Sequence, residues 1–76
     1  MSYTFRIILR LEPEGGYTVM VPSLPGCVTY GATLEEANAM AQDAIQGCIE
    51  VLREEGEEIR DDSRNFEQNI QVAVAA

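Results

Sequence analysis

The stretch from Val21 to Ala37, VPSLPGCVTYGATLEEA, constrains the fold more than any other part of the chain. Pro22 and Pro25 lack the backbone N–H that a central sheet ladder needs, so a paired strand must stop here. Gly26 can take the positive φ of a tight turn, and we expect Pro25 and Gly26 to form one. These signals predict a corner between two strands.

The second half of this stretch predicts a short strand that leads into a helix. The strand-forming run that begins at Cys27 is interrupted by Gly31. Thr33 and Glu36 have the spacing of a capping box, in which each side chain accepts from the backbone N–H of the other residue. The corner is expected to be structural, with direct contact to a partner as the alternative. The fold-defining motif therefore consists of Pro22, Pro25, Gly26, Cys27, Gly31, Thr33 and Glu36.

Alternating apolar and polar residues predict strands on both sides of the corner. From Tyr3 to Leu11 every odd position is apolar, and the pattern resumes from Tyr17 to Val21 after a Glu-Pro-Glu-Gly-Gly turn. Ile8 breaks the alternation, which indicates a second contact surface. A last alternating run from Phe66 to Val74 predicts a final strand.

Apolar residues spaced three and four apart predict a helix from Leu34 to Glu55, with Gly56 as its C′ residue. The apolar stripe is rich in alanine, so we expect the helix backbone to lie close to the sheet. The charged stretch 57–64 is expected to be a mobile connection. The predicted fold is α+β in the order β-β-β-α-β, one antiparallel sheet with one long helix on a face, forming a single domain over residues 1–76.

The charge balance favours a protein partner over a nucleic acid. Thirteen acidic residues against five arginines give a net charge of −8, which repels a phosphate backbone. The same charge would speed encounter with a basic protein, although keeping the protein soluble is an alternative role. A chain of 76 residues buries only about 60% of its unfolded surface, so we expect a homo-oligomer, a dimer or tetramer.

The residue types for catalysis are scarce. Histidine is absent, and Cys27 has no neighbour in the sequence to activate it. Cys27 and Cys48 lack metal-ligand spacing, and the acidic runs at 54–58 and 61–62 lack an EF-hand pattern. We therefore expect no enzymatic activity, no metal and no cofactor. Reduced thiols and the lack of a signal peptide or membrane-spanning segment lead us to expect a cytoplasmic protein.

At the residues of the corner and the capping box, the chain resembles the HicB antitoxin family. The resemblance rests on PSLPGC at positions 22–27 joined to GATLEEA at 31–37, and it runs in register from about Tyr3 to Ile59. It implies a partial RNase H-like fold with three strands, a helix and a further strand. It also implies binding to a small basic RNA-cleaving toxin, HicA, and blocking of its active site. Many HicB proteins carry a C-terminal DNA-binding domain, and because this sequence ends at Ala76 we expect none here.

Three functional hypotheses follow. The first is a HicB-like antitoxin, or an orphan relative, that occludes a HicA-type toxin without doing chemistry. The second is a homo-oligomeric scaffold or regulatory module without a toxin, and the third is an enzyme. For the first, the expected partner-binding residues are those of the outer helix face, whose alternative role is simply that of a solvated surface: Glu35, Asp43, Glu50 and Glu54.

Overall fold

The computed structural model describes residues 2–75 and has three strands followed by one helix. The strands are β1 (Ile8–Leu11), β2 (Tyr17–Met20) and β3 (Val28–Gly31), and the helix is α1 (Leu34–Glu54). The α+β class and the order β-β-β-α agree with the prediction. The helix ends one residue earlier than expected, and the first strand begins at Ile8 rather than Tyr3.

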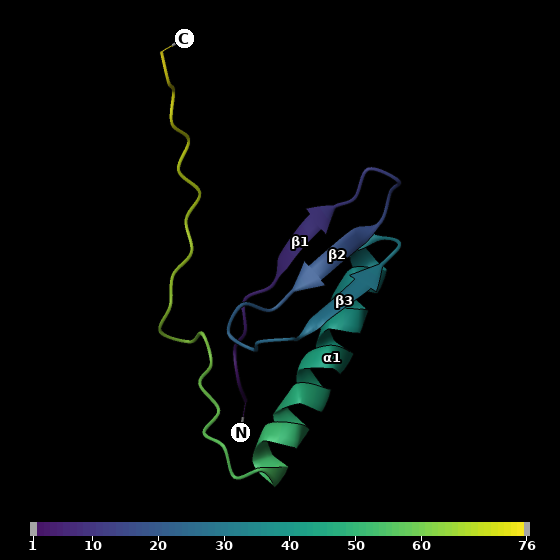
Figure 1. Cartoon of the computed structure of the whole chain (residues 1–76), viewed down its shortest axis with the longest axis vertical. Helices are drawn as coiled ribbons and strands as arrows, with labels where there is room; N and C mark the ends of the chain where they lie inside the picture. Colours follow the sequence, from purple (N-terminus) through teal and green to yellow (C-terminus); the bar gives the residue numbers. More distant parts are fainter. Residues whose placement is uncertain (1, 76) are drawn as a thin grey trace.

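The sheet is antiparallel in the order β1-β2-β3, with α1 packed on one face (Figure 1). Leu9 lies opposite Val19 on the neighbouring strand, and Val19 lies opposite Thr29. Because cross-strand partners share a face, Leu9 and Val19 both point toward the helix, where they pack with Ala37 and Ala41. Leu11 is the last residue of the apolar alternation that begins at Tyr3, but it is 66% exposed at the end of β1.

Small residues bring α1 very close to β3, as the alanine-rich stripe predicted. Ala37 and Ala41 are buried against Val19, which is the largest fully buried side chain among the described residues. A Cβ placed on Gly31 would lie 2.3 Å from the backbone nitrogen and 2.4 Å from the Cα of Ala37. Gly31 is therefore needed because the helix backbone occupies the space of a side chain.

The predicted corner is present between β2 and β3. Gly26 has φ +82°, and three hydrogen bonds close the turns: Leu24 N–H to Val21 O at 3.0 Å, Cys27 N–H to Leu24 O at 2.9 Å, and Val21 N–H to Cys27 O at 3.1 Å. Val21, Leu24 and Cys27 are buried together against the second half of α1. The corner thus supplies a second small core.

The helix begins at the predicted cap, with one difference in the partner of Glu36. The Thr33 hydroxyl accepts from the N–H of Glu36 at 3.1 Å, as expected. The Glu36 carboxylate accepts from the N–H of Ala32 at 3.4 Å rather than from that of Thr33. At the other end, Gly56 follows the C-cap with φ +71°, which confirms it as the C′ residue.

The stretch 57–64 was expected to be a mobile connection, and this prediction is wrong for its last residues. The N–H of Asp62 donates to the carbonyl of Thr4 at 2.7 Å, and the Asp61 carboxylate accepts from the N–H of Thr4 at 2.9 Å. Asp62 itself is only 4% exposed. Hydrogen bonds therefore hold this stretch to the segment that precedes β1.

The predicted final strand does not form in this chain on its own. Residues 66–75, which we call the C-terminal arm, contain no strand and run clear of the sheet (Figure 1). The apolar side chains of the arm that share one parity are 72–90% exposed: Phe66, Ile70, Val72 and Val74. A strand needs a neighbour to complete its backbone hydrogen bonds, and the arm has none within the described chain.

Candidate functional site

The acidic residues expected to contact a partner all lie exposed along α1: Glu35, Asp43, Glu50 and Glu54. At 3.6 residues per turn they fall within about 100° of the helix circumference, and they are spread over roughly 28 Å of its length. This side is opposite the buried alanine stripe. Whether it binds a partner stays a prediction.

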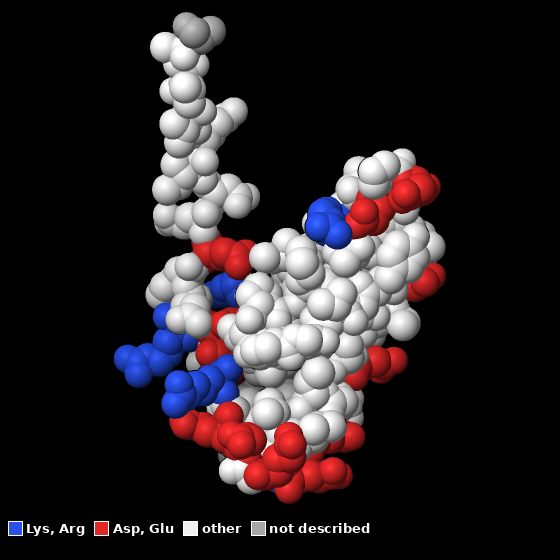
Figure 2. All heavy atoms as spheres, in the orientation of Figure 1, with Lys and Arg blue, Asp and Glu red and all other residues white. Residues whose placement is uncertain are grey.

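These carboxylates are not neutralised by neighbouring arginines. Within residues 2–75, ion pairs join Arg10 to Glu12 at 3.0 Å and Arg60 to Glu58 at 3.5 Å. Figure 2 shows acidic side chains gathered at the end of the molecule where α1 ends, and basic side chains near the base of the C-terminal arm. The exposed acidic residues at the helix end are Glu54, Glu55, Glu57 and Glu58. The helix end is therefore a surface of negative charge that can attract a basic protein.

An apolar groove runs between α1 and the segment that leads into β1. Its volume is about 490 Å³, and Phe5, Ile7, Ala41, Ile45 and Ile49 supply its apolar lining. Polar helix residues, among them Gln42 and Glu50, stand at its rim. The groove exists because the helix lies over β2 and β3 and leaves the flank beside β1 uncovered. Sequence periodicity did not reveal it, since periodicity does not say which strands a helix covers.

A second groove of about 440 Å³ lies on the other flank of α1. Leu24 and Pro25 of the corner form one wall, and Ala44, Cys48 and Val51 of the helix form the other. Pro25, expected to be structural, is therefore exposed beside this groove as well as part of the turn. The helix has an apolar depression on each side and an acidic ridge between them.

The helix-free face of the sheet carries an apolar row and a polar row. Ile8, Met20 and Val28 are cross-strand neighbours on this face, and Ile8 and Val28 are 42% and 59% exposed. The centre of the face seen in Figure 2 is largely uncharged. The sequence predicted a second contact surface at Ile8. Ile8 is exposed away from the helix, and its contact with another molecule stays a prediction.

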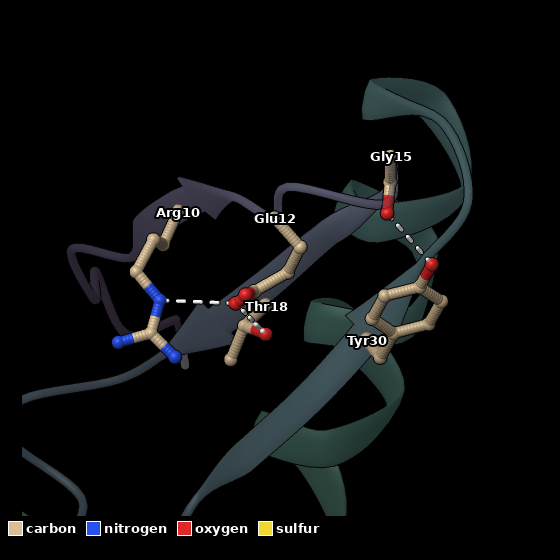
Figure 3. Close-up of polar contacts among 5 residues, drawn as sticks. All are labelled: Arg10, Glu12, Gly15, Thr18 and Tyr30. Atoms are coloured by element: carbon tan, nitrogen blue, oxygen red, sulfur yellow. Dashed lines mark hydrogen bonds and ion pairs between the residues drawn. The ribbon is translucent and has the colours of Figure 1, made fainter.

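The polar row is organised around the first hairpin (Figure 3). The Glu12 carboxylate accepts from the Thr18 hydroxyl at 2.7 Å and from Arg10 Nε at 3.0 Å. The Thr18 hydrogen bond, followed by that of Arg10, lowers the pKa of Glu12. Tyr30 donates its phenolic hydrogen to the carbonyl of Gly15 at 3.2 Å. These contacts fix the turn between β1 and β2.

Asp62 is the buried charged residue of the described chain. Its carboxylate accepts from the N–H of Arg6 at 2.9 Å, from the Ser23 hydroxyl at 2.5 Å and from the Asn65 side-chain amide at 2.9 Å. These three donors, Arg6 first, lower the pKa of Asp62. We call Asp62 and these partners the Asp62 cluster. It ties the end of the chain to the segment before β1 and to the corner, so its role is structural.

The two thiols lie beside each other in the second small core, and the acidic groups do not gather into a metal site in the part of the chain that the structure describes. Burial, together with the adjacent Cys48 thiol, raises the pKa of Cys27 to about 11, so Cys27 is protonated at neutral pH. No group of three or more ligating side chains is found in residues 2–75. No helix in the same range has the length and apolar character needed to cross a membrane.

Comparison with known proteins agrees with the fold. Over residues 5–73 the chain matches the family described as the HicB-like antitoxin of bacterial toxin–antitoxin systems. It is 41% identical over 63 residues to a UPF0150 protein of Thermoplasma acidophilum, covering 83% of this chain and 88% of that protein. It is 38% identical over 76 residues to antitoxin HicB 2 of Photorhabdus laumondii, covering 99% of this chain and 55% of the antitoxin. Antitoxin HicB 1 of the same organism is 45% identical over 56 residues, which are 71% of this chain and 36% of that protein.

The match is broad within this chain, although the chain spans only about half or less of the two named antitoxins. It includes the sheet, the corner, the capped helix, the Asp62 cluster and most of the C-terminal arm. The motif that led to the predicted resemblance lies inside it. The chain therefore belongs to the HicB-like antitoxin family of bacterial toxin–antitoxin systems.

Proposed function

We propose that this protein neutralises a small basic toxin of the HicA type by binding over its RNA-cleaving site, without catalysing a reaction itself. Membership of an antitoxin family implies a toxin partner in general terms. The observation that supports a basic partner is the row of carboxylates on α1, which is exposed and without arginine partners. Such a row attracts a positively charged protein, and the pairing of opposite charges fixes the position in which the two proteins bind.

A non-catalytic mechanism is supported by the chemistry of the side chains. The sequence has no histidine, and the high pKa of Cys27 keeps its thiol protonated. The acidic residues that do have shifted pKa values, Glu12, Asp61 and Asp62, are held by hydrogen bonds within the fold. Inhibition by occlusion needs none of these groups to react. We place the pair in the cytoplasm, where a toxin that cleaves RNA meets its substrate.

The test is a charge reversal on the helix with a matched control. Asp43→Lys/Glu54→Lys changes two carboxylates of the acidic helix face, and Glu14→Lys/Glu67→Lys makes the same charge change at exposed sites elsewhere. Each reversal adds two positive charges, so both variants move the net charge from −8 to −4. The partner to be tested is a short basic protein encoded by a gene next to that of this chain. Binding is measured by calorimetry at several salt concentrations, together with inhibition of RNA cleavage.

We expect the helix variant to bind about tenfold or more weakly and with less dependence on salt, because like charges then face each other across the interface. The control variant should bind nearly as the unchanged protein does. Equal losses in both variants would show that total charge matters and the helix face does not. Full binding by the helix variant would remove this face from the interface, and no binding by the unchanged protein would favour the homo-oligomeric scaffold.

A further inference from the structure

The C-terminal arm has the sequence of a strand but no strand beside it. Ile70, Val72 and Val74 alternate with Gln71 and Ala73, and these three apolar side chains are 72–85% exposed. Positions 68–75 carry no charge in a chain whose net charge is −8. An uncharged, alternating apolar segment exposed on a soluble protein is a pairing surface, because it would otherwise drive aggregation.

The direction of the arm is set by hydrogen bonds at its base. The Asp62 cluster holds the chain beside the segment before β1, and a turn follows in which the N–H of Asn65 donates to the carbonyl of Asp62 at 3.0 Å. The Arg6 side chain also donates to the carbonyl of Asn65. Phe66, the next residue, is 90% exposed, and the arm leaves the body there (Figure 1). The base of the arm is therefore held beside the segment before β1, while residues 66–75 are not paired with their own β1.

The body has a matching place for such an arm. β1 is at an edge of the sheet, so one of its sides has no paired neighbour among residues 2–75. The groove lined by Phe5, Ile7, Ile45 and Ile49 lies directly beside it, on the helix side. A strand laid along β1 would place every second side chain on the helix side, and therefore in this groove. The arm meets this condition, because its apolar residues Ile70, Val72 and Val74 occupy every second position.

We propose that the C-terminal arm of one copy adds as a strand to the free edge of β1 of a second copy, with Ile70, Val72 and Val74 in that copy's apolar groove. The second copy returns its own arm in the same way. Such a reciprocal contact closes at two copies, as isologous dimers do. The uncharged stretch 68–75 is also the part of this acidic chain that can approach another copy with the least charge repulsion. The proposal does not depend on a toxin.

The first test compares two neighbouring substitutions that add the same charge to opposite faces of the arm. Val72→Glu puts a carboxylate in the groove, whereas Ala73→Glu puts it on the open face of the sheet. Light scattering with size-exclusion chromatography should give twice the 8.4 kDa chain mass for the unchanged protein and for Ala73→Glu. Val72→Glu should weaken the dimer about 100-fold or more while its circular dichroism stays unchanged, since Val72 is exposed in a single copy.

The second test asks which copy holds the arm. In a mixture of isotope-labelled and unlabelled protein, filtered nuclear Overhauser spectra should show contacts between the methyls of Val72 in one copy and Phe5 or Ile45 in the other. The proposal is overturned if the unchanged protein is a monomer at millimolar concentration, or if Val72→Glu dimerises as tightly as Ala73→Glu. It is also overturned if those contacts occur within one copy, or if the arm becomes ordered only when a toxin is added.

Discussion

Because α1 lies very close to β3, we expect the change from glycine to alanine to destabilise the protein at Gly31 and to stabilise it at Gly47. Gly31→Ala adds a Cβ that would lie 2.3–2.4 Å from the backbone of Ala37, which is too close for any side-chain adjustment to relieve. Overpacking of this kind costs about 1–3 kcal/mol in the free energy of unfolding. We expect the upper part of that range, because the obstacle is the helix backbone itself.

Gly47→Ala is the matched control within the helix. Gly47 lies on α1 with no atom within 4 Å of an added Cβ, so the change only improves helix propensity. This should stabilise the protein by about 0.5–1 kcal/mol. Propensity alone would favour alanine at Gly31 too, because glycine in a strand weakens it. The opposite signs therefore separate steric contact from propensity.

The assay is urea unfolding followed by circular dichroism, with thermal melts alongside. For a domain of this size 1 kcal/mol corresponds to about 4–8 °C in Tm, so a loss of about 2–3 kcal/mol should lower the Tm of Gly31→Ala by roughly 8–24 °C. Gly47→Ala should melt a few degrees higher. If Gly31→Ala were as stable as the unchanged protein, the helix would have to lie farther from β3 than described, and our reason for the glycine would be wrong.

Two further predictions concern titratable groups. The pKa of Asp62 is lowered in the folded state, so the ionised carboxylate stabilises the fold above its unfolded pKa, and this stabilisation is lost as the pH falls through the folded pKa. In Asp62→Asn the free energy of unfolding should therefore decrease less steeply below about pH 5 than in the unchanged protein. The measurement is urea unfolding at several pH values, with Asp43→Asn as the control. Cys27 has a pKa of about 11, which leaves roughly 0.1% thiolate at pH 8. Iodoacetamide should accordingly modify Cys27 far more slowly in the folded protein than in urea, as read by mass spectrometry, and equal rates would contradict its burial.

The parts of the fold that the sequence predicted are those with local causes. The corner depends on Pro25 and Gly26, and the helix start depends on the hydroxyl of Thr33, so each is readable within a few residues. The partner predicted for the Glu36 carboxylate in the capping box was wrong, because a flexible Glu36 side chain can reach the N–H of Ala32 as easily as that of Thr33. The alanine stripe likewise predicted that the helix lies close to the sheet, although it did not indicate that the closest approach of the two backbones is at Gly31.

The parts that sequence reasoning missed have distant causes. Asp62 belongs to the charged stretch 57–64 that we expected to be mobile, but its hydrogen-bond partners Arg6 and Ser23 lie 56 and 39 positions away. The groove beside β1 exists because of the particular strands that α1 covers. The spacing of apolar residues along the sequence does not reveal which strands these are. The alternation of the C-terminal arm predicted a strand that the structure does not contain. A strand also needs a partner edge, and the sequence does not contain that information.

The two proposed surfaces lie on different parts of the molecule, and this has a consequence for stoichiometry. The arm would use the edge of β1 and the groove beside it, whereas Asp43 and Glu54 of the acidic helix face do not line that groove. Glu50 stands at the rim of the groove and is the residue that the two surfaces share. Two copies joined by their arms would therefore keep two acidic helix faces exposed, related by the same two-fold axis. A toxin bound through that face should accordingly form a complex of two toxins with two copies of this chain, and Val72→Glu should turn it into one of each.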